Sequence, residues 1–306
     1  MACRSAALAV LILASVVHVA TADDATSQPT RATTVPAGYR PHITSGPGGK
    51  IDWANGLLLV EGIGKARGTD EQQQKMAERA ATVVAARNAL SLAAGVQVNR
   101  YGRFSDLRDG TVQIEGMIKG HFAVAVNWDP KATPPTCKIT LGVPMWGIKG
   151  LSAIVFEEER KRSRSAAHMP IVESDDARIG EGEFIVIDAR GTQLRPCMFP
   201  IVINADGRVL YDVSVRSQYH GEILQTVRYV EVDPLSAPTP ATSKPSQSES
   251  SELHHFKIQP LSRLSRTDIV LGRGDVRTIA RNPKLVSLLR AGRMLVVLDP
   301  ATDRED

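Results

Sequence analysis

Cysteine, aromatic residues and long apolar runs are all scarce in this chain of 306 residues. Aromatic residues make up 5% of the chain, and its three cysteines exclude a small fold built on a dense set of disulfides. Beyond the N-terminus, no stretch approaches the roughly 20 apolar residues that span a bilayer. We therefore predict no transmembrane span in the mature chain.

No charge of one sign dominates either. Lys and Arg number 37 against 33 Asp and Glu, a formal net charge of +4, without the concentrated basic patch that nucleic-acid binding needs. The composition, 42% apolar and 23% charged, is that of a globular protein and excludes collagen, coiled coil and wholesale disorder. We expect no nucleic-acid partner.

Motifs that carry chemistry are missing as well. The chain contains no HExxH, paired CxxC, GxxxxGK[ST] or GxSxG, and its histidines are mostly isolated, His254-His255 being an adjacent pair. The glycine-rich segment 62–68 precedes a predicted helix, but its last glycine falls one residue late for a dinucleotide loop. We assign no catalytic, metal or cofactor residue and expect no cofactor; because carboxylates are plentiful, an unrecognised hydrolase stays open.

Residues 1–22 have the pattern of a signal peptide. Arg4 supplies the charged region, Ala6–Val17 the apolar region, and Ala20-Thr21-Ala22 the small residues for cleavage. An uncleaved anchor helix is the alternative, but the apolar run is short for it. A lipid-accepting cysteine would have to follow the apolar region, whereas Cys3 precedes it. Residues 23–50, with four prolines and no apolar periodicity, predict a disordered arm.

The first predicted domain covers residues 51–164. It opens with a strand at 57–66, and Thr69-Asp70-Glu71-Gln72 fits a capping box that starts a helix from about Asp70 to Ala94, with Gly95 expected as a left-handed C-cap. We expect the buried face of that helix to be the apolar stripe Met76, Ala80, Val83, Leu90 and Ala94. Arg87 lies on the same stripe, which predicts a packed stem and a head paired with a carboxylate.

Three strands and a short helix should complete this domain. The strands are expected at 96–104, 111–127 and 138–145, and short connections predict antiparallel neighbours. Gly116 and Gly120 interrupt the second strand and indicate a bulge or bend. The helix is expected at 147–164.

The second predicted domain covers residues 179–299. Its expected strands are 184–188, a hairpin of 199–204 and 208–215 around Ala205-Asp206-Gly207, then 225–232, 256–258 and 294–299, with a helix at 273–282. The Pro- and Ser-rich segment 233–252 predicts a disordered insertion. The fold class is therefore α+β, as two units of mainly antiparallel sheet with packed helices.

Cys137 and Cys197 are the cysteines that remain after export. In an oxidising compartment they could form a disulfide. The alternative is two buried free thiols that pack as small hydrophobes. The sequence does not separate these two interpretations.

Several segments together carry a family resemblance over about residues 51–156. These are Ile51-Asp52-Trp53-Ala54-Asn55-Gly56, the segment 60–66, MAERAATVVAARN at 76–88, Ile114-Glu115-Gly116 and Val143-Pro144-Met145-Trp146-Gly147. In this order they resemble the outer-membrane lipoprotein family that includes flagellar basal-disc lipoproteins. The chain departs from that family by lacking its lipid-bearing cysteine, so a membrane anchor does not carry over.

The resemblance implies an exported, periplasmic or outer-membrane-associated envelope protein without enzymatic activity. We expect a structural or assembly component of a surface or flagellum-like apparatus, with envelope proteins or further copies of itself as partners. A periplasmic module that binds a peptide, glycan or cell-wall fragment is the alternative.

Overall fold

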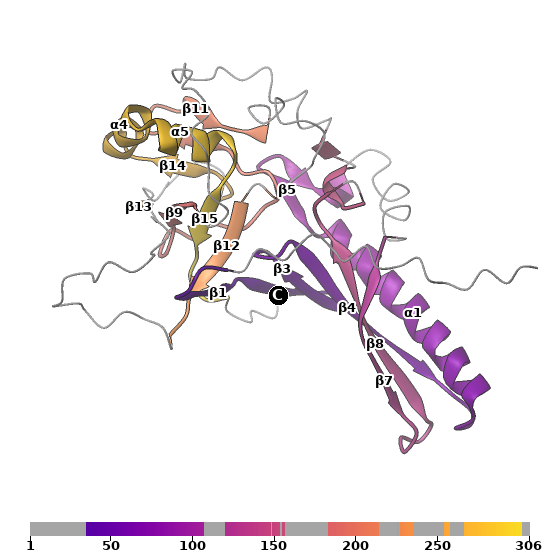
Figure 1. Cartoon of the computed structure of the whole chain (residues 1–306). Helices are drawn as coiled ribbons and strands as arrows, with labels where there is room; N and C mark the ends of the chain where they lie inside the picture. The colour runs from indigo at the N-terminus through magenta and orange to yellow at the C-terminus, as the bar shows by residue number, and fades with distance from the viewer. Residues whose placement is uncertain are drawn as a thin grey trace, which may run out of the picture. The chain divides into compact units, whose positions relative to one another are not determined.

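The structure is a computed structural model of the whole chain (Figure 1). The residues that it describes are 35–106, 120–147, 149–153, 155–156, 183–213, 225, 227–234, 254–257 and 266–301. The predicted signal peptide, the first part of the predicted arm, residues 111–119 of a predicted strand, the charged end of the predicted helix at 147–164 and residues 235–252 of the predicted insertion lie outside these ranges. The predicted α+β class is confirmed, because the described helices pack beside both antiparallel and mixed sheets.

The first sheet is antiparallel, as predicted. Its strand order is β2-β3-β4-β8-β7. The strands are β2 (Ile43–Gly46), β3 (Gly49–Asp52), β4 (Leu57–Lys65), β7 (Phe122–Asp129) and β8 (Thr136–Pro144). The predicted strands at 57–66 and 138–145 correspond to β4 and β8, and the described end of the strand predicted at 111–127 corresponds to β7.

The prediction of a disordered arm is wrong for its last part. Residues 35–50 include β2, the start of β3 and a further short strand, β1 (Tyr39–Pro41), which joins a different sheet by pairing antiparallel with β12 (Val227–Val232). The prediction of disorder rested on the prolines of this segment, which the folded structure accommodates. Pro41 lies in an edge strand, and Pro47 lies in the turn between β2 and β3, and neither place requires a ladder N–H.

Helix α1 (Glu71–Ala94) confirms the strongest prediction of the sequence. Its cap is Asp70, whose carboxylate accepts a hydrogen bond from the Gln73 amide at 3.0 Å, so the cap is Asp70 and not Thr69. Gly95 is not left-handed: its φ is −80° and its ψ is −11°, and its N–H bonds the Leu92 carbonyl at 3.1 Å. A right-handed cap needs no glycine, which is why this residue was a poor guide to the geometry.

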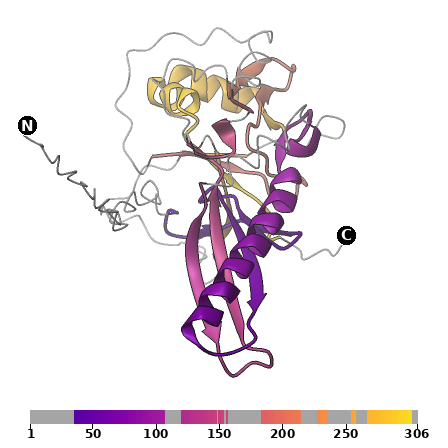
Figure 2. The same cartoon turned by 90° about the vertical axis from the view of Figure 1, so that its right-hand side faces the viewer.

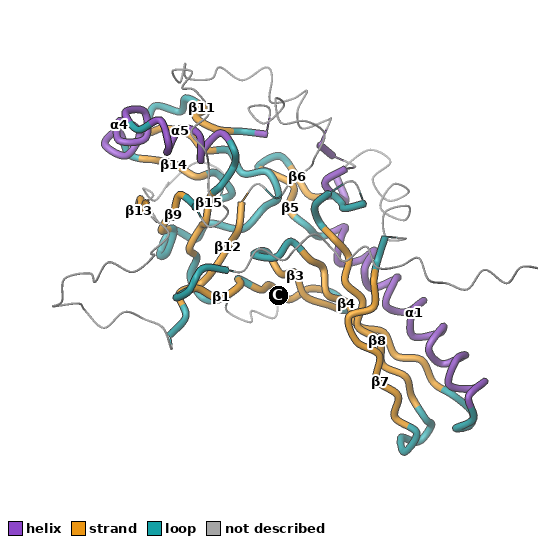
Figure 3. The backbone as a smooth tube through the Cα atoms, in the orientation of Figure 1, coloured by secondary structure: helices purple, strands orange, loops and turns teal. Residues whose placement is uncertain are grey.

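One face of α1 lies along β4 and β8, as the turned view in Figure 2 and the tube in Figure 3 show. The buried side chains of this face are small, and four of them follow one another at intervals of four residues: Ala77, Ala81, Ala85 and Ala89. Ala77, Ala81 and Ala85 lie against Gly62 and Gly64 of β4, where an added Cβ would come within 3.0 Å of the helix backbone. Glycine on the strand and alanine on the helix thus allow the two backbones to approach closely.

The strand predicted at 96–104 is a tight hairpin instead. It consists of β5 (Gln97–Asn99) and β6 (Gly102–Arg103), followed by a short 3₁₀ turn at Phe104–Asp106. The Asn99 side chain accepts a hydrogen bond from the Tyr101 amide at 2.7 Å. Such an Asx turn reverses the chain, so the predicted continuous strand is broken at Asn99.

The second sheet departs from the predicted antiparallel arrangement. Its order is β1-β12-β15-β9-β13, with β9 (Ile185–Asp188), β13 (His254–Lys257) and β15 (Met294–Val297). Only the β1–β12 pairing is antiparallel among those described; the β12–β15, β15–β9 and β9–β13 pairings are parallel. The uninterrupted burial of β15 fits this arrangement, because parallel strands are usually covered on both faces.

A three-stranded sheet and two helices lie after β9 in the sequence. The predicted hairpin is confirmed as β10 (Val202–Asn204) and β11 (Val209–Tyr211), with Gly207 at φ +80° in its turn, and β14 (Ile269–Leu271) pairs parallel with β10. The predicted last helix is α4 (Arg273–Arg281). A second helix, α5 (Pro283–Arg290), follows at once, because Asn282 ends α4 and caps α5.

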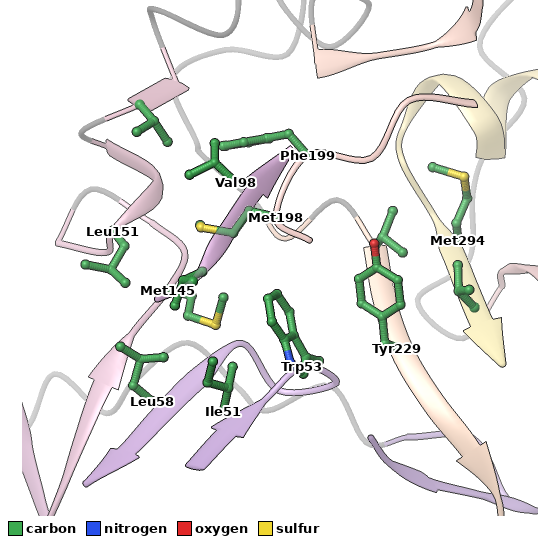
Figure 4. Packing of buried hydrophobic residues seen from close by; sticks show 14 of the residues in the cluster. Ile51, Trp53, Leu58, Val98, Met145, Leu151, Met198, Phe199, Tyr229 and Met294 are labelled. Carbon is green, nitrogen blue, oxygen red and sulfur yellow. The ribbon is translucent and has the colours of Figure 1, made fainter. Parts of the chain in front are cut away.

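Buried apolar side chains of both predicted domains belong to one cluster. Figure 4 shows Trp53 and Met145 from the first segment near Met198 and Tyr229 from the second. The rings of Trp53 and Tyr229 meet edge to face with centroids 5.9 Å apart. Contacts of this kind make residues 34–306 one compact unit.

Candidate interaction surface

Metal and membrane signals give no site in the part of the chain that the structure describes. There, no three His, Cys, Asp or Glu side chains come together as a potential metal site. Likewise, no helix among those residues has both the length and the apolar character needed to cross a membrane. A functional site among the described residues must therefore lie in the buried polar groups or on the surface.

The disulfide considered between Cys137 and Cys197 is not formed. Both cysteines are free and buried. Cys137 lies in β8 opposite Gly64 and Trp128, where burial and the nearby Glu78 carboxylate raise the pKa of its thiol. A raised pKa keeps this thiol protonated and a poor nucleophile.

Cys197 belongs to a buried cluster with Tyr229. The Tyr229 hydroxyl accepts a hydrogen bond from the Cys197 amide at 3.2 Å and donates one to the Cys197 carbonyl at 3.1 Å. Burial raises the pKa of Tyr229 well above its ordinary value. A neutral phenol that bonds both backbone groups of one residue holds a loop in place, which is a structural role.

A second buried cluster surrounds Glu231 of β12. One carboxylate oxygen accepts from His42 Nδ1 and from the Ala301 amide, each at 2.9 Å, and the other accepts from Arg40 Nε at 2.9 Å. Burial raises the pKa of Glu231, but these hydrogen bonds outweigh it and the pKa lies below its ordinary value. Burial lowers the pKa of His42 by more than Glu231 raises it. The cluster fastens β1 and the residues after β15 to β12.

A third buried polar group is the pair formed by Arg100 and Asp268. The guanidinium Nη2 lies 3.1 Å from Asp268 Oδ2, and the Asp268 side chain is only 1% exposed. Neither carboxylate oxygen accepts a hydrogen bond from the residues that the structure describes. Burial raises the pKa of Asp268 to about 6, against the opposing effect of Arg100. This carboxylate is too enclosed to meet a substrate.

The outward face of α1 is the feature that remains. Met76 is 56% exposed, Val83 53% and Val84 37%, and Ala80 between them is exposed too. We call Met76, Ala80, Val83 and Val84 the outer stripe. The sequence prediction placed Met76, Ala80 and Val83 in the core, and this prediction is wrong; Leu90 and Ala94 are half-buried, and of these Leu90 packs on the core.

The helix presents its larger apolar side chains to the surface because its other face cannot hold them. Gly62 and Gly64 bring the strand so close that Cβ atoms of alanine fill the space. A valine or methionine there would force the backbones apart. Exposed apolar residues grouped on one helix face are a mark of interaction sites.

Basic residues flank the outer stripe. Arg79 and Arg87 are exposed, and neither forms an ion pair among the described residues. The predicted packing and pairing of Arg87 is therefore wrong, because that face of the helix points to solvent. Lys75 is paired with Glu71 at 2.6 Å.

Strand β7 adds a second exposed apolar region. It is the last strand in the order of its sheet, and Val124 and Val126 are 51% and 46% exposed. The strand pairing is irregular between Ala123 and Ala125. The sequence placed the bulge or bend at Gly116, which lies outside the described residues, and at Gly120, which lies in a turn before β7. An irregular edge limits uncontrolled strand pairing.

Sequence reasoning missed the outer stripe, although a signal was present. The four alanines at intervals of four residues define a continuous face, and alternating glycines at 62 and 64 define a matching face of a strand. Read together, these two patterns indicate a close helix–strand contact. The helical spacing of Met76, Ala80, Val83, Leu90 and Ala94, taken without the strand, selected the opposite face.

One family model matches part of the chain. It is described as Treponema pallidum Tp0624, second domain, and it matches residues 184–300, which run from Phe184 before β9 to Pro300 after β15. No curated protein matches the chain. The matched segment is thus similar to that domain, and it does not include the outer stripe.

Proposed function

We propose that this protein is an exported, nonenzymatic envelope component that acts in a surface or flagellum-like assembly by docking a partner on the outer stripe of α1. The observation that carries the proposal is the way α1 distributes its apolar side chains. Small ones pack on the sheet, while Met76, Val83 and Val84 face solvent. Apolar side chains grouped in this way on one exposed helix face mark a site where another molecule docks.

Features of the sequence support the same proposal. The pattern of residues 1–22 is that of an export signal, and the resemblance over residues 51–156 is to envelope proteins that assemble. The polar clusters around Tyr229, Glu231 and Asp268 are buried and engaged with neighbouring backbone or charges. They are suited to holding the fold together and not to turning over a substrate.

The apolar part of the docking surface is small. Covering three side chains that are each about half exposed stabilises a complex by roughly 3 kcal/mol, against about 8 kcal/mol for micromolar affinity. The outer stripe therefore needs either additional polar contacts or many copies acting together. Both are usual in assemblies.

Site-specific photocrosslinking tests the proposal. A photoreactive residue at Val83, in the full chain expressed in its native cells, should give a discrete crosslinked product. The control places it at Ala280, an exposed residue of α4, where that product should be absent. Met76→Asn should reduce the yield of the product at Val83.

Two results would overturn the proposal. One is the absence of a product at Val83, or the same product at both positions. The other is hydrolysis of a cell-wall, ester or peptide substrate that a single Ser, Asp, Glu or His substitution abolishes without unfolding the protein.

A further inference from the structure

The outward half of α1 carries positive charge without matching negative charge. Arg79 and Arg87 are exposed and form no ion pair with any residue in the described ranges, while Lys75 is matched by Glu71. The remaining acid of this stretch, Glu78, lies toward the sheet, where its charge acts on Cys137. The surface around the outer stripe is therefore cationic.

Helical spacing places these arginines beside the outer stripe. Arg79 follows Met76 by three residues and Arg87 follows Val83 by four, and residues at these intervals are neighbours on a helix surface. The two arginines are eight residues apart, which is about 12 Å along the axis. A carboxylate-bearing partner that covers Met76 and Val83 can thus reach both guanidinium groups.

A second copy of α1 is a poor occupant of this surface. Two outer stripes packed together would bring four unpaired arginines to one interface, and like charges across an interface are unfavourable. An anionic lipid surface fits the charge, but four small or medium apolar residues offer little to insert between lipids. A protein segment that supplies both an apolar row and carboxylates matches all the features.

We propose that the outer stripe docks an acidic amphipathic helix of a partner protein, an inference that rests on the proposed function. Its apolar row covers Met76, Ala80 and Val83, and its Asp or Glu residues pair with Arg79 and Arg87. In such a contact between two amphipathic helices, the apolar row supplies the affinity, and the flanking charges set which partner is accepted.

Two model peptides test the partner chemistry. Both are helix-forming, about 18 residues or five turns long, and share one Leu and Ala row; one has Glu flanks and the other Lys flanks. Fluorescence anisotropy with the full mature chain should show the Glu peptide binding about tenfold more tightly than the Lys peptide. The preference should shrink between about 50 mM and about 300 mM salt, because exposed ion pairs are screened.

Charge reversal supplies the matched control. The double variant Arg79→Glu, Arg87→Glu should lose or invert the preference for the Glu peptide. Arg277→Glu with Arg281→Glu makes the same charge change on exposed residues of α4 and should leave the preference intact. Equal binding of both peptides, or an unchanged preference in the Arg79 and Arg87 variant, would overturn the acidic partner.

The remaining outcomes separate this inference from the proposed function. A Val83 crosslink that persists in the Arg79→Glu, Arg87→Glu variant refutes the acidic partner and leaves docking on the outer stripe standing. Loss of that crosslink in the variant, with retention in the α4 control, supports the inference. Self-association through α1 in sedimentation, or binding to phosphatidylglycerol vesicles that Val83→Asp abolishes, would assign the surface to another occupant and overturn it.

Discussion

Gly64 of β4 lies directly beneath Ala77 of α1, so that a Cβ added to the glycine would collide with the Ala77 carbonyl and come within 2.7 Å of the Ala81 amide. Backbone atoms on both sides make this contact, and no flexible side chain can move aside. The close approach of α1 to β4 therefore depends on glycine at this position.

We predict that Gly64→Ala destabilises the protein by about 1–3 kcal/mol, the usual cost of overpacking. Urea unfolding followed by circular dichroism measures the change. Gly274→Ala is the control: this residue lies in the first turn of α4 with nothing near its Cβ position, so the change should be neutral or stabilising by up to about 1 kcal/mol. Equal losses in the two variants would contradict the packing described for Gly64.

Val83→Asp should leave the free energy of unfolding within about 0.5 kcal/mol of the wild type, because the side chain is exposed. Ala81→Asp, two residues earlier and fully buried against β4, should lose at least about 3 kcal/mol. The same urea titration compares the two. A large loss in Val83→Asp would mean that this residue packs in the core.

The position of α1 could be predicted from the sequence, but its buried face could not. The helix and both of its ends follow from Asp70, the long run without proline and the change of pattern at Gly95. Its buried face did not follow, because burial of Ala77 and Ala81 depends on glycines in a strand that precedes the helix. The apolar spacing within α1, taken without the strand, assigns Met76 and Val83 to the core.

Partners distant in sequence explain the other differences. Residues 39–41 are too short and too polar to predict a strand by themselves, and they become one because β12 offers an edge and Glu231 holds Arg40 and His42. The strands β9 and β15 were predicted, but their parallel pairing was not. They lie far apart in the sequence, so neither segment alone indicates its partner. The outer stripe is apolar in the sequence, and it faces outward because the other face of α1 packs closely on Gly62 and Gly64.

Tyr229→Phe should lower stability by about 1–3 kcal/mol. The change removes the hydroxyl that bonds both the amide and the carbonyl of Cys197, and a buried backbone group without a partner is costly. Loss of these bonds should also expose Cys197 to a thiol reagent under native conditions, while Cys137 stays protected in β8. Mass spectrometry of the labelled protein gives both rates. Unchanged stability and labelling would exclude a holding role for the hydroxyl.

The pair of Arg100 and Asp268 predicts a pH dependence of stability with a definite sign. The pKa of Asp268 is raised from 3.8 to about 6 in the folded protein, mainly by burial, so the folded state binds more protons than the unfolded state between these values. Stability from this residue is therefore full below about pH 4 and is lost as the pH rises toward 6. At 1.36 kcal/mol per pKa unit, the loss is roughly 3 kcal/mol.

Asp268→Asn should remove that loss, because the amide has a similar shape and does not ionise. The variant should gain stability relative to the wild type as the pH rises from about 4 to 6, and then hold a constant advantage. His42 and Glu231, whose pKa values are lowered, act in the opposite direction in both proteins and cancel in the difference. Urea titrations at several pH values give this difference curve.

Arg100→Gln provides the second half of the test. The guanidinium lowers the pKa of Asp268 against the effect of burial, so its removal should raise that pKa further. The loss of stability should still begin near pH 4 but extend to higher pH and become larger. When both proteins carry Asp268→Asn, the effect of Arg100→Gln on stability should no longer depend on pH between about 4 and 6. A difference curve for Asp268→Asn that is flat, or that falls with pH, would show that the carboxylate is not enclosed as the structure has it, because burial is the main cause that raises the pKa of Asp268 against Arg100.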